Sequence, residues 1–163
     1  PEKFLPSYYL TGKEFIQYML ELYGVEYQEP SVLQMLKVLD LNPQSLRKTV
    51  GELSKGMAQK LGLAACLLSE RKLLILDEPM SGLDPKARAY LKKYLIEIKE
   101  QGKTLFFSTH LLADVQSLCD RMAILHNQTL KFVGSPAECC DQYSTDDLEQ
   151  AYLRCIQAQH NGD

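Results

Sequence analysis

Tryptophan, long hydrophobic runs and an excess of basic residues are all missing from this sequence of 163 residues. The longest uninterrupted apolar stretch, Leu63–Leu68, is far shorter than the ~20 residues that cross a bilayer as a helix. The first residues do not show the basic segment, apolar run and small-residue cleavage site of a signal peptide. The sequence therefore predicts no direct membrane insertion.

The charge balance and the cysteines narrow the class further. The formal net charge is -3, whereas binding to DNA or RNA calls for a basic surface, so we expect no nucleic acid partner. The five cysteines are odd in number and lack C-x-x-C spacing, which is typical of reduced thiols in a cytosolic protein. Adjacent Cys139 and Cys140 have no second ligand pair, which favours ordinary helix positions over a zinc site.

A phosphate-binding loop of the pattern G-x-x-x-x-G-K-[ST] is also missing. The pair Gly12-Lys13 is followed by an acid, and the Gly-Lys-Thr run at 102–104 has Glu97 at the first glycine position. That run also joins a predicted helix to a predicted strand, which is the reverse of the required order. Because the chain begins at Pro1 and not at an initiator methionine, we expect it to be a piece of a longer polypeptide.

The amino-terminal part of the chain has the pattern of two short amphipathic helices. A capping box at Thr11 and Glu14 predicts a helix that ends at Gly24, and a second helix begins near Pro30 and stops at Pro43. Apolar residues at helical spacing support both: Phe15, Ile16, Met19, Leu20, Tyr23, Val32, Leu33, Met35, Leu36 and Leu39. We predict a small helical subdomain here.

Strands and helices alternate in the rest of the chain, which predicts right-handed βαβ units and a mainly parallel sheet. The fold class is therefore α/β. The expected strands are 73–76, 104–108 and 122–125, with a turn at 127–128 leading into 129–133. The expected helices are 54–68, 84–102, 111–118, 136–140 and 146–158.

Polar residues that suit phosphate chemistry follow two of these strands. The stretch LLILDEPMSGLD brings Asp77 and Glu78 to the end of a buried parallel strand, where open α/β sheets bind ligands. Such a pair can hold Mg²⁺ and position a water, or it can simply cap the following turn. His110 follows the next strand in LFFSTH, either as a site residue at the same sheet edge or as a structural histidine.

Two helix starts offer further candidates. Ser54 and Gly56 in LSKGMAQK open a helix whose free N–H groups can bind an anion, although a serine cap is common without any ligand. Asp84 with Pro85 has the pattern of an N-cap and a first-turn proline. Each pattern alone leaves both interpretations open.

The order of these motifs resembles the nucleotide-binding domain of ABC (ATP-binding cassette) transporter ATPases. LSKGM resembles the signature motif, ILDEP the Walker B motif, SGLD the D-loop, and His110 the switch histidine. The resemblance runs from about Pro1 to Val133 and implies an incomplete P-loop NTPase (RecA-like) fold with a small helical subdomain. It divides the chain into residues 1–60, which end at the signature motif, 61–135, which hold the second half of the ATPase core, and 136–163, the C-terminal helices.

The resemblance also implies the cofactors ATP and Mg²⁺ and a role for each site residue. Asp77 would hold the metal, together with Glu2 at the position where the family has the glutamine of its Q-loop. The catalytic residues would be Glu78 and His110, with Glu78 acting on the water. The residues implied to contact nucleotide are Ser54, Lys55, Gly56, Met57 and Asp84. Lys55 replaces a glycine and Met57 a glutamine of many members, a form that resembles exporters of the ABC-2 type.

The resemblance implies part of the subunit that hydrolyses ATP to power a membrane transporter. Its partners would be a transmembrane permease subunit and a second nucleotide-binding domain, as a homodimer. Its location would be cytoplasmic and peripheral on the inner face of the cell membrane. We expect this chain alone to be inactive, and to self-associate through a hydrophobic sheet edge left bare. The alternatives are a non-catalytic module that docks on a transporter, and a soluble ABC protein acting on ribosomes or DNA, which the acidic balance disfavours.

Overall fold

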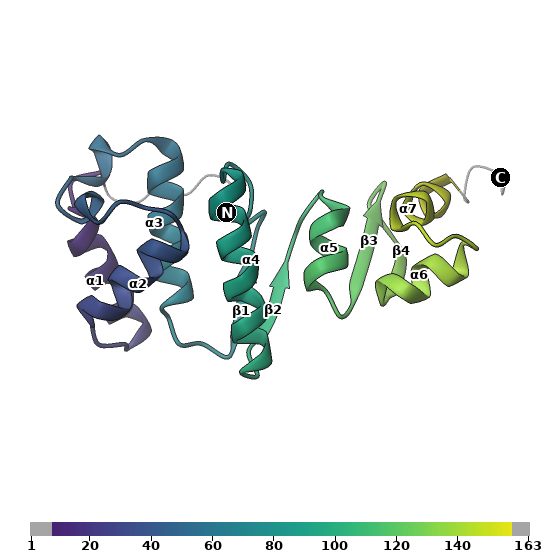
Figure 1. Ribbon diagram of the computed structural model, residues 1–163, viewed down its shortest axis with the longest axis horizontal. Helices are drawn as coiled ribbons and strands as arrows, with labels where there is room; N and C mark the ends of the chain where they lie inside the picture. The colour runs from purple at the N-terminus through teal and green to yellow at the C-terminus, as the bar shows by residue number, and fades with distance from the viewer. Residues whose placement is uncertain (1–7, 158–163) are drawn as a thin grey trace. The chain divides into compact units, whose positions relative to one another are not determined.

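The computed structural model describes residues 8–157 of the chain (Figure 1). The chain divides into two compact units, Pro1–Ser108 and Thr109–Asp163. The predicted metal residue Glu2 lies outside the described residues. The longest helix of the described part has 16 residues, and none there is both long and apolar enough to cross a bilayer.

The first unit begins with the predicted helical subdomain. Helix α1 spans Gly12–Tyr23 and α2 spans Glu29–Val38, followed by the short 3-10 turns η1 (Pro43–Leu46) and η2 (Val50–Glu52). The capping box of α1 is confirmed, and Gly24 ends that helix with a left-handed φ of 72°. Most of the predicted apolar stripe is buried, but Leu33 is exposed because α2 turns that position to solvent.

Close backbone contact between α1 and η1 requires the glycine at position 12. A Cβ atom at Gly12 would lie 2.5 Å from the carbonyl oxygen of Ser45 and 3.1 Å from the Cα of Leu46, both of them backbone atoms. Neither atom can move without shifting η1.

We therefore expect Gly12→Ala to lower the free energy of unfolding by about 1–3 kcal/mol, the usual cost of overpacking. Gly56→Ala is the matched control, because a Cβ there meets nothing within 4 Å. Urea denaturation of both variants measures the difference. Equal unfolding midpoints for the two would contradict this contact.

The α/β part of the first unit contains α3 (Lys55–Leu67), β1 (Leu73–Leu76), α4 (Pro85–Glu100) and β2 (Thr104–Phe107). The two strands pair in parallel, with Leu73 opposite Thr104 and Leu76 opposite Phe107. Helices α1 and α2 both contact α3, while α4 contacts α2 and β2. Gly102, with φ of 90°, lies between α4 and β2, which confirms that the Gly-Lys-Thr run there is a helix end and not a phosphate loop.

One face of the β1–β2 sheet is exposed. Leu74 and Leu76 point into the core, but the alternate residues Leu73 and Ile75 are 53% and 69% exposed. Phe106 on β2 lies opposite Ile75 and is 66% exposed. The prediction of a fully buried strand is therefore wrong for this chain, because helices cover only one of its two faces.

The second unit contains α5 (Leu112–Leu118), β3 (Met122–His126), β4 (Thr129–Gly134), α6 (Pro136–Gln142) and α7 (Leu148–Gln157). Strands β3 and β4 form an antiparallel hairpin, and its two turn residues, Asn127 and Gln128, have φ of 48° and 61°. The core of this unit consists of Val115, Ile124, Phe132, Cys139, Leu148, Ala151 and Cys155.

The fold class is confirmed as α/β, but fewer strands pair in parallel than the sequence predicted. Among residues 8–157 the strands form two separate two-stranded sheets, and only β1 with β2 is parallel. The predicted turn at 127–128 is confirmed, and it pairs the strand at Met122 with the strand that follows as an antiparallel hairpin.

Candidate functional site

The candidate site begins where β1 and β2 end. Asp77 follows the last residue of β1, and Ser108 follows the last residue of β2. The backbone N–H of Ser108 donates to the carbonyl oxygen of Leu76 at 3.0 Å, which extends the parallel ladder by one step. The two polar side chains are therefore neighbours at the carboxyl edge of the sheet, where α/β folds bind ligands.

The hydroxyl of Ser108 joins the two acidic residues of the site. It donates to Oδ1 of Asp77 at 2.5 Å, and it accepts from the backbone N–H of Glu78 at 2.9 Å. Glu78 has a left-handed φ of 44°, which a residue with a Cβ adopts only when its surroundings hold it there.

The segment after these acids is a tight turn that leads into α4. The backbone N–H of Ser81 donates to Glu78 at 3.0 Å, and that of Leu83 donates to Met80 at 3.3 Å. Met80 and Leu83 are buried, so their side chains anchor the turn, and Gly82 has a φ of 70°. This is the segment with the SGLD sequence.

Asp84 is the N-cap of α4, as its sequence pattern predicts. Its Oδ1 accepts from the backbone N–H groups of Lys86 at 3.0 Å and Ala87 at 2.9 Å. Its Oδ2 accepts from Nζ of Lys60 on α3 at 3.2 Å. These bonds, first that from the Ala87 backbone and then that from Lys60, hold the pKa of Asp84 below its usual value.

This shift predicts acid sensitivity of the α4 cap. The folded chain binds a proton on Asp84 less readily than the unfolded chain, so the cap stabilises the fold above pH ~4, the ordinary aspartate value, and this contribution is lost as pH falls through the lowered value. Asp84→Asn keeps an acceptor but removes the charge. We expect it to lower the urea midpoint near neutral pH, with the difference from wild type shrinking in acid. A difference that stays constant with pH would contradict the assignment.

The LSKGM segment opens α3 as predicted. Ser54 is the N-cap, and its Oγ accepts from the backbone N–H of Met57 at 3.3 Å. Lys55 is exposed, and a Cβ at Gly56 would meet nothing within 4 Å. The glycine therefore has no packing role in the described part of the chain and leaves the helix N-terminus accessible to a ligand.

Two side chains of α3 connect it to the turn after β1, and no sequence pattern indicated either contact. Nε2 of Gln59 donates to the carbonyl oxygen of Ser81 at 2.9 Å. Lys60, whose side chain is 11% exposed, contacts Asp84 and also the carbonyl oxygen of Asp40 at 3.3 Å. The LSKGM helix and the SGLD turn are therefore held together through side chains.

His110 and the predicted metal ligands differ from the residues above in how far the structure tests their predicted places. His110 is exposed and belongs to the second unit, so its predicted place beside Asp77 and Glu78 stays a prediction. Among residues 8–157 no group of three His, Cys, Asp or Glu side chains gathers to hold a metal ion. Mg²⁺ commonly takes only one or two carboxylates, with waters and substrate phosphates completing its shell, so the Asp77 carboxylate fits such an ion.

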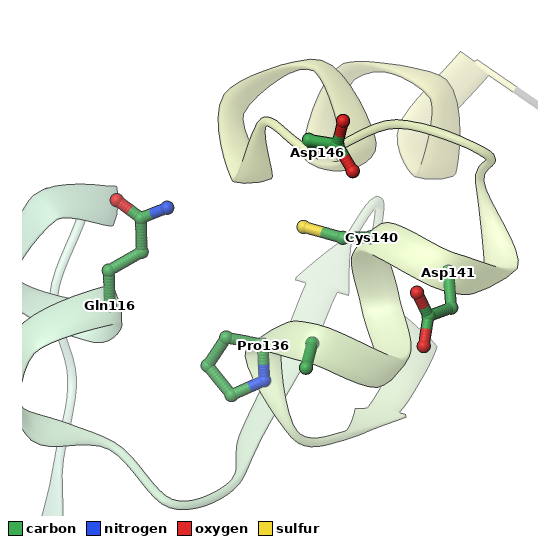
Figure 2. A pocket seen from close by; sticks show the side chains of 6 residues that line it. Gln116, Pro136, Cys140, Asp141 and Asp146 are labelled. Atoms are coloured by element: carbon green, nitrogen blue, oxygen red, sulfur yellow. The ribbon is translucent and has the colours of Figure 1, made fainter.

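A separate hollow of about 300 Å³ lies in the second unit. Figure 2 shows its lining side chains, Gln116, Pro136, Ala137, Cys140, Asp141 and Asp146. Burial and the neighbouring carboxylates, first Asp141, raise the pKa of the Cys140 thiol, which therefore stays protonated near neutral pH. A protonated thiol is a poor nucleophile and a poor metal ligand.

Known proteins decide the family. The family model described as ABC transporter matches residues 12–81, which include the LSKGM and ILDEP segments. The chain is 41% identical over 133 residues to an ABC transporter ATP-binding protein of Synechocystis sp.. The aligned region covers 80% of this chain and 38% of the relative. This chain belongs to the ABC transporter ATP-binding family.

A further relative and a solved structure also support membership of this ABC family. It is 36% identical to a fluoroquinolones export ATP-binding protein of Mycobacterium tuberculosis, over 82% of this chain and 44% of that relative. A solved ATP-binding subunit of an ABC transporter superimposes with a TM-score of 0.84 at 30% identity, covering 95% of this chain and 66% of the other. The chain thus spans less than half the length of these two curated relatives.

Proposed function

We propose that this chain is part of the subunit that binds and hydrolyses ATP to power an ABC membrane transporter. The observation that carries the proposal is the pair Asp77 and Glu78 at the end of β1, held by Ser108, in a chain whose relatives are named as ATP-binding proteins. Asp77 would bind Mg²⁺, which supplies charge neutralisation for the phosphates when it is bound. Glu78 would accept a proton from the attacking water.

The LSKGM segment would serve a different nucleotide from Asp77 and Glu78. The free N–H groups at the start of α3, with Ser54, Lys55, Gly56 and Met57, would contact phosphate held by a second nucleotide-binding domain. Asp84 would act from the turn that Lys60 ties to this helix. His110 would contact the γ-phosphate, and Glu2 would help Asp77 to hold the metal.

The partners follow from this assignment. A homodimer of the intact subunit would bring two sites together, and a transmembrane permease subunit would carry the substrate path. The subunit would act in the cytoplasm, on the inner face of the membrane. The named role of one relative in fluoroquinolone export supports an exporter, and the SKGM form agrees with that direction.

Phosphate release from MgATP by the intact protein tests the proposal. We expect hydrolysis that requires Mg²⁺ and that the 163-residue chain alone does not perform, because a backbone cradle for the phosphates is missing from its sequence. An intact protein that binds a transporter but hydrolyses no MgATP would support a non-catalytic docking module instead.

A further inference from the structure

The contacts of Ser108 support a role for this residue in addition to the roles of the two acids. Neither the LFFSTH pattern nor the family model, which ends at residue 81, gives it a role. Yet this side chain bonds to both residues of the acidic pair, at 2.5 Å to the Asp77 carboxylate and 2.9 Å from the Glu78 backbone. We propose that Ser108 is a positioning residue for the metal and water side of the ATPase site, an inference that rests on the proposed function.

The first part of its action concerns Asp77. A carboxylate offers about four lone-pair directions, and a hydroxyl donor at one of them fixes the rotation of the group. With Oδ1 held by Ser108, the side chain presents its remaining lone pairs in one orientation. A cation that takes one carboxylate and depends on exact octahedral geometry then meets a preorganised ligand.

The second part concerns Glu78. Its left-handed φ of 44° is a strained conformation for a residue with a side chain. The Oγ of Ser108 accepts the backbone N–H of Glu78 and so stabilises that conformation. One hydroxyl thereby sets the direction of both acids, donating to the first residue and accepting from the second.

The parallel register explains why a residue 31 positions away reaches this pair. Leu76 lies opposite Phe107, so the next residue of each strand, Asp77 and Ser108, fall side by side at the sheet edge. Ser108 is exposed, so a larger β-branched residue fits there without disturbing the core. Its role can therefore be changed without removing side chains from the core.

Threonine and valine at this position form a matched pair of variants. Ser108→Thr keeps the hydroxyl, and Ser108→Val has the same shape without it. We expect the Thr variant of the intact protein to stay within about twofold of wild type. We expect the Val variant to need about tenfold more Mg²⁺ for half-maximal ATP hydrolysis, because a hydrogen bond to a charged group is lost. In the 163-residue chain, the Glu78 amide should exchange about tenfold faster with Val than with Thr.

A control separates this role from general stability. Thr104→Val removes a hydroxyl from the same face of the same strand, and we expect it to change neither the Mg²⁺ requirement nor the Glu78 exchange rate. If wild type hydrolyses ATP but the Thr and Val variants have the same Mg²⁺ requirement, the positioning role is overturned. If wild type hydrolyses no MgATP, the proposed function has failed, and the positioning role for that reaction fails with it.

Discussion

Replacement of Glu78 by glutamine in the intact protein should lower the rate of MgATP hydrolysis by about 10²–10⁴-fold, the usual contribution of a general base. Glutamine has nearly the same shape but cannot accept the proton of an attacking water. The backbone bond from Glu78 to Ser108 does not depend on the side chain, so the turn should keep its geometry. Phosphate release at saturating MgATP measures the rate.

Nucleotide binding distinguishes this result from simple unfolding. Binding of ATP by the Glu78→Gln variant, measured by equilibrium dialysis, should stay close to that of wild type. Glu100→Gln is the matched control, because Glu100 is an exposed acid at the end of α4, and its rate should not change. A Glu78→Gln protein that keeps more than about a tenth of the wild-type rate would contradict the role of general base.

Replacement of both Ile75 and Phe106 by lysine should keep the 163-residue chain monomeric, whereas the wild-type chain should self-associate. These two side chains lie opposite each other on the exposed face of the sheet, and both are more than half exposed. Burial of such a side chain contributes about 1.5–3 kcal/mol. In a two-fold symmetric dimer each replacement occurs in both copies of the interface. The dissociation constant should therefore rise at least ~100-fold.

Light scattering across a wide range of protein concentrations checks this prediction. Leu22→Lys is the control, because Leu22 is also an exposed apolar residue, at 61%, but lies on α1. It should leave the self-association unchanged. A wild-type chain that stays monomeric at every concentration would contradict the association of this face.

The local elements were predictable because their signals are local. The capping box at Thr11 and Glu14, the left-handed Gly24 and the N-cap Asp84 each act within a few residues, and the structure has all three. The run of four aliphatic residues predicted β1 at Leu73–Leu76, and the structure has the same bounds. What it could not show is which face of that strand the rest of the chain covers, because burial depends on neighbours distant in sequence.

The candidate site also contains residues that the sequence indicated and residues that only the folded chain brings together. Motif order indicated Asp77, Glu78 and the LSKGM helix, and the family model matches the range 12–81 that contains them. Ser108 was missed as a partner of the acids, although its position after a strand that pairs with β1 was a usable signal. Lys60 gave no such signal, because its contact with Asp84 depends on where the start of α4 lies relative to α3 in the folded chain.

The amino-acid sequence alone thus determined the family, the α/β class, the helix caps and the two carboxylates of the candidate site, since these depend on residue type and short spacing. The tertiary structure decided three other points. The parallel pairing of β1 with β2 brings Ser108 to the acids across 31 residues. Gln59 and Lys60 of α3, the LSKGM helix, bond to Ser81 in the SGLD turn and to Asp84. Helices cover only one face of the sheet, which leaves Ile75 and Phe106 exposed, because burial is a property of contacts between segments and not of any one segment.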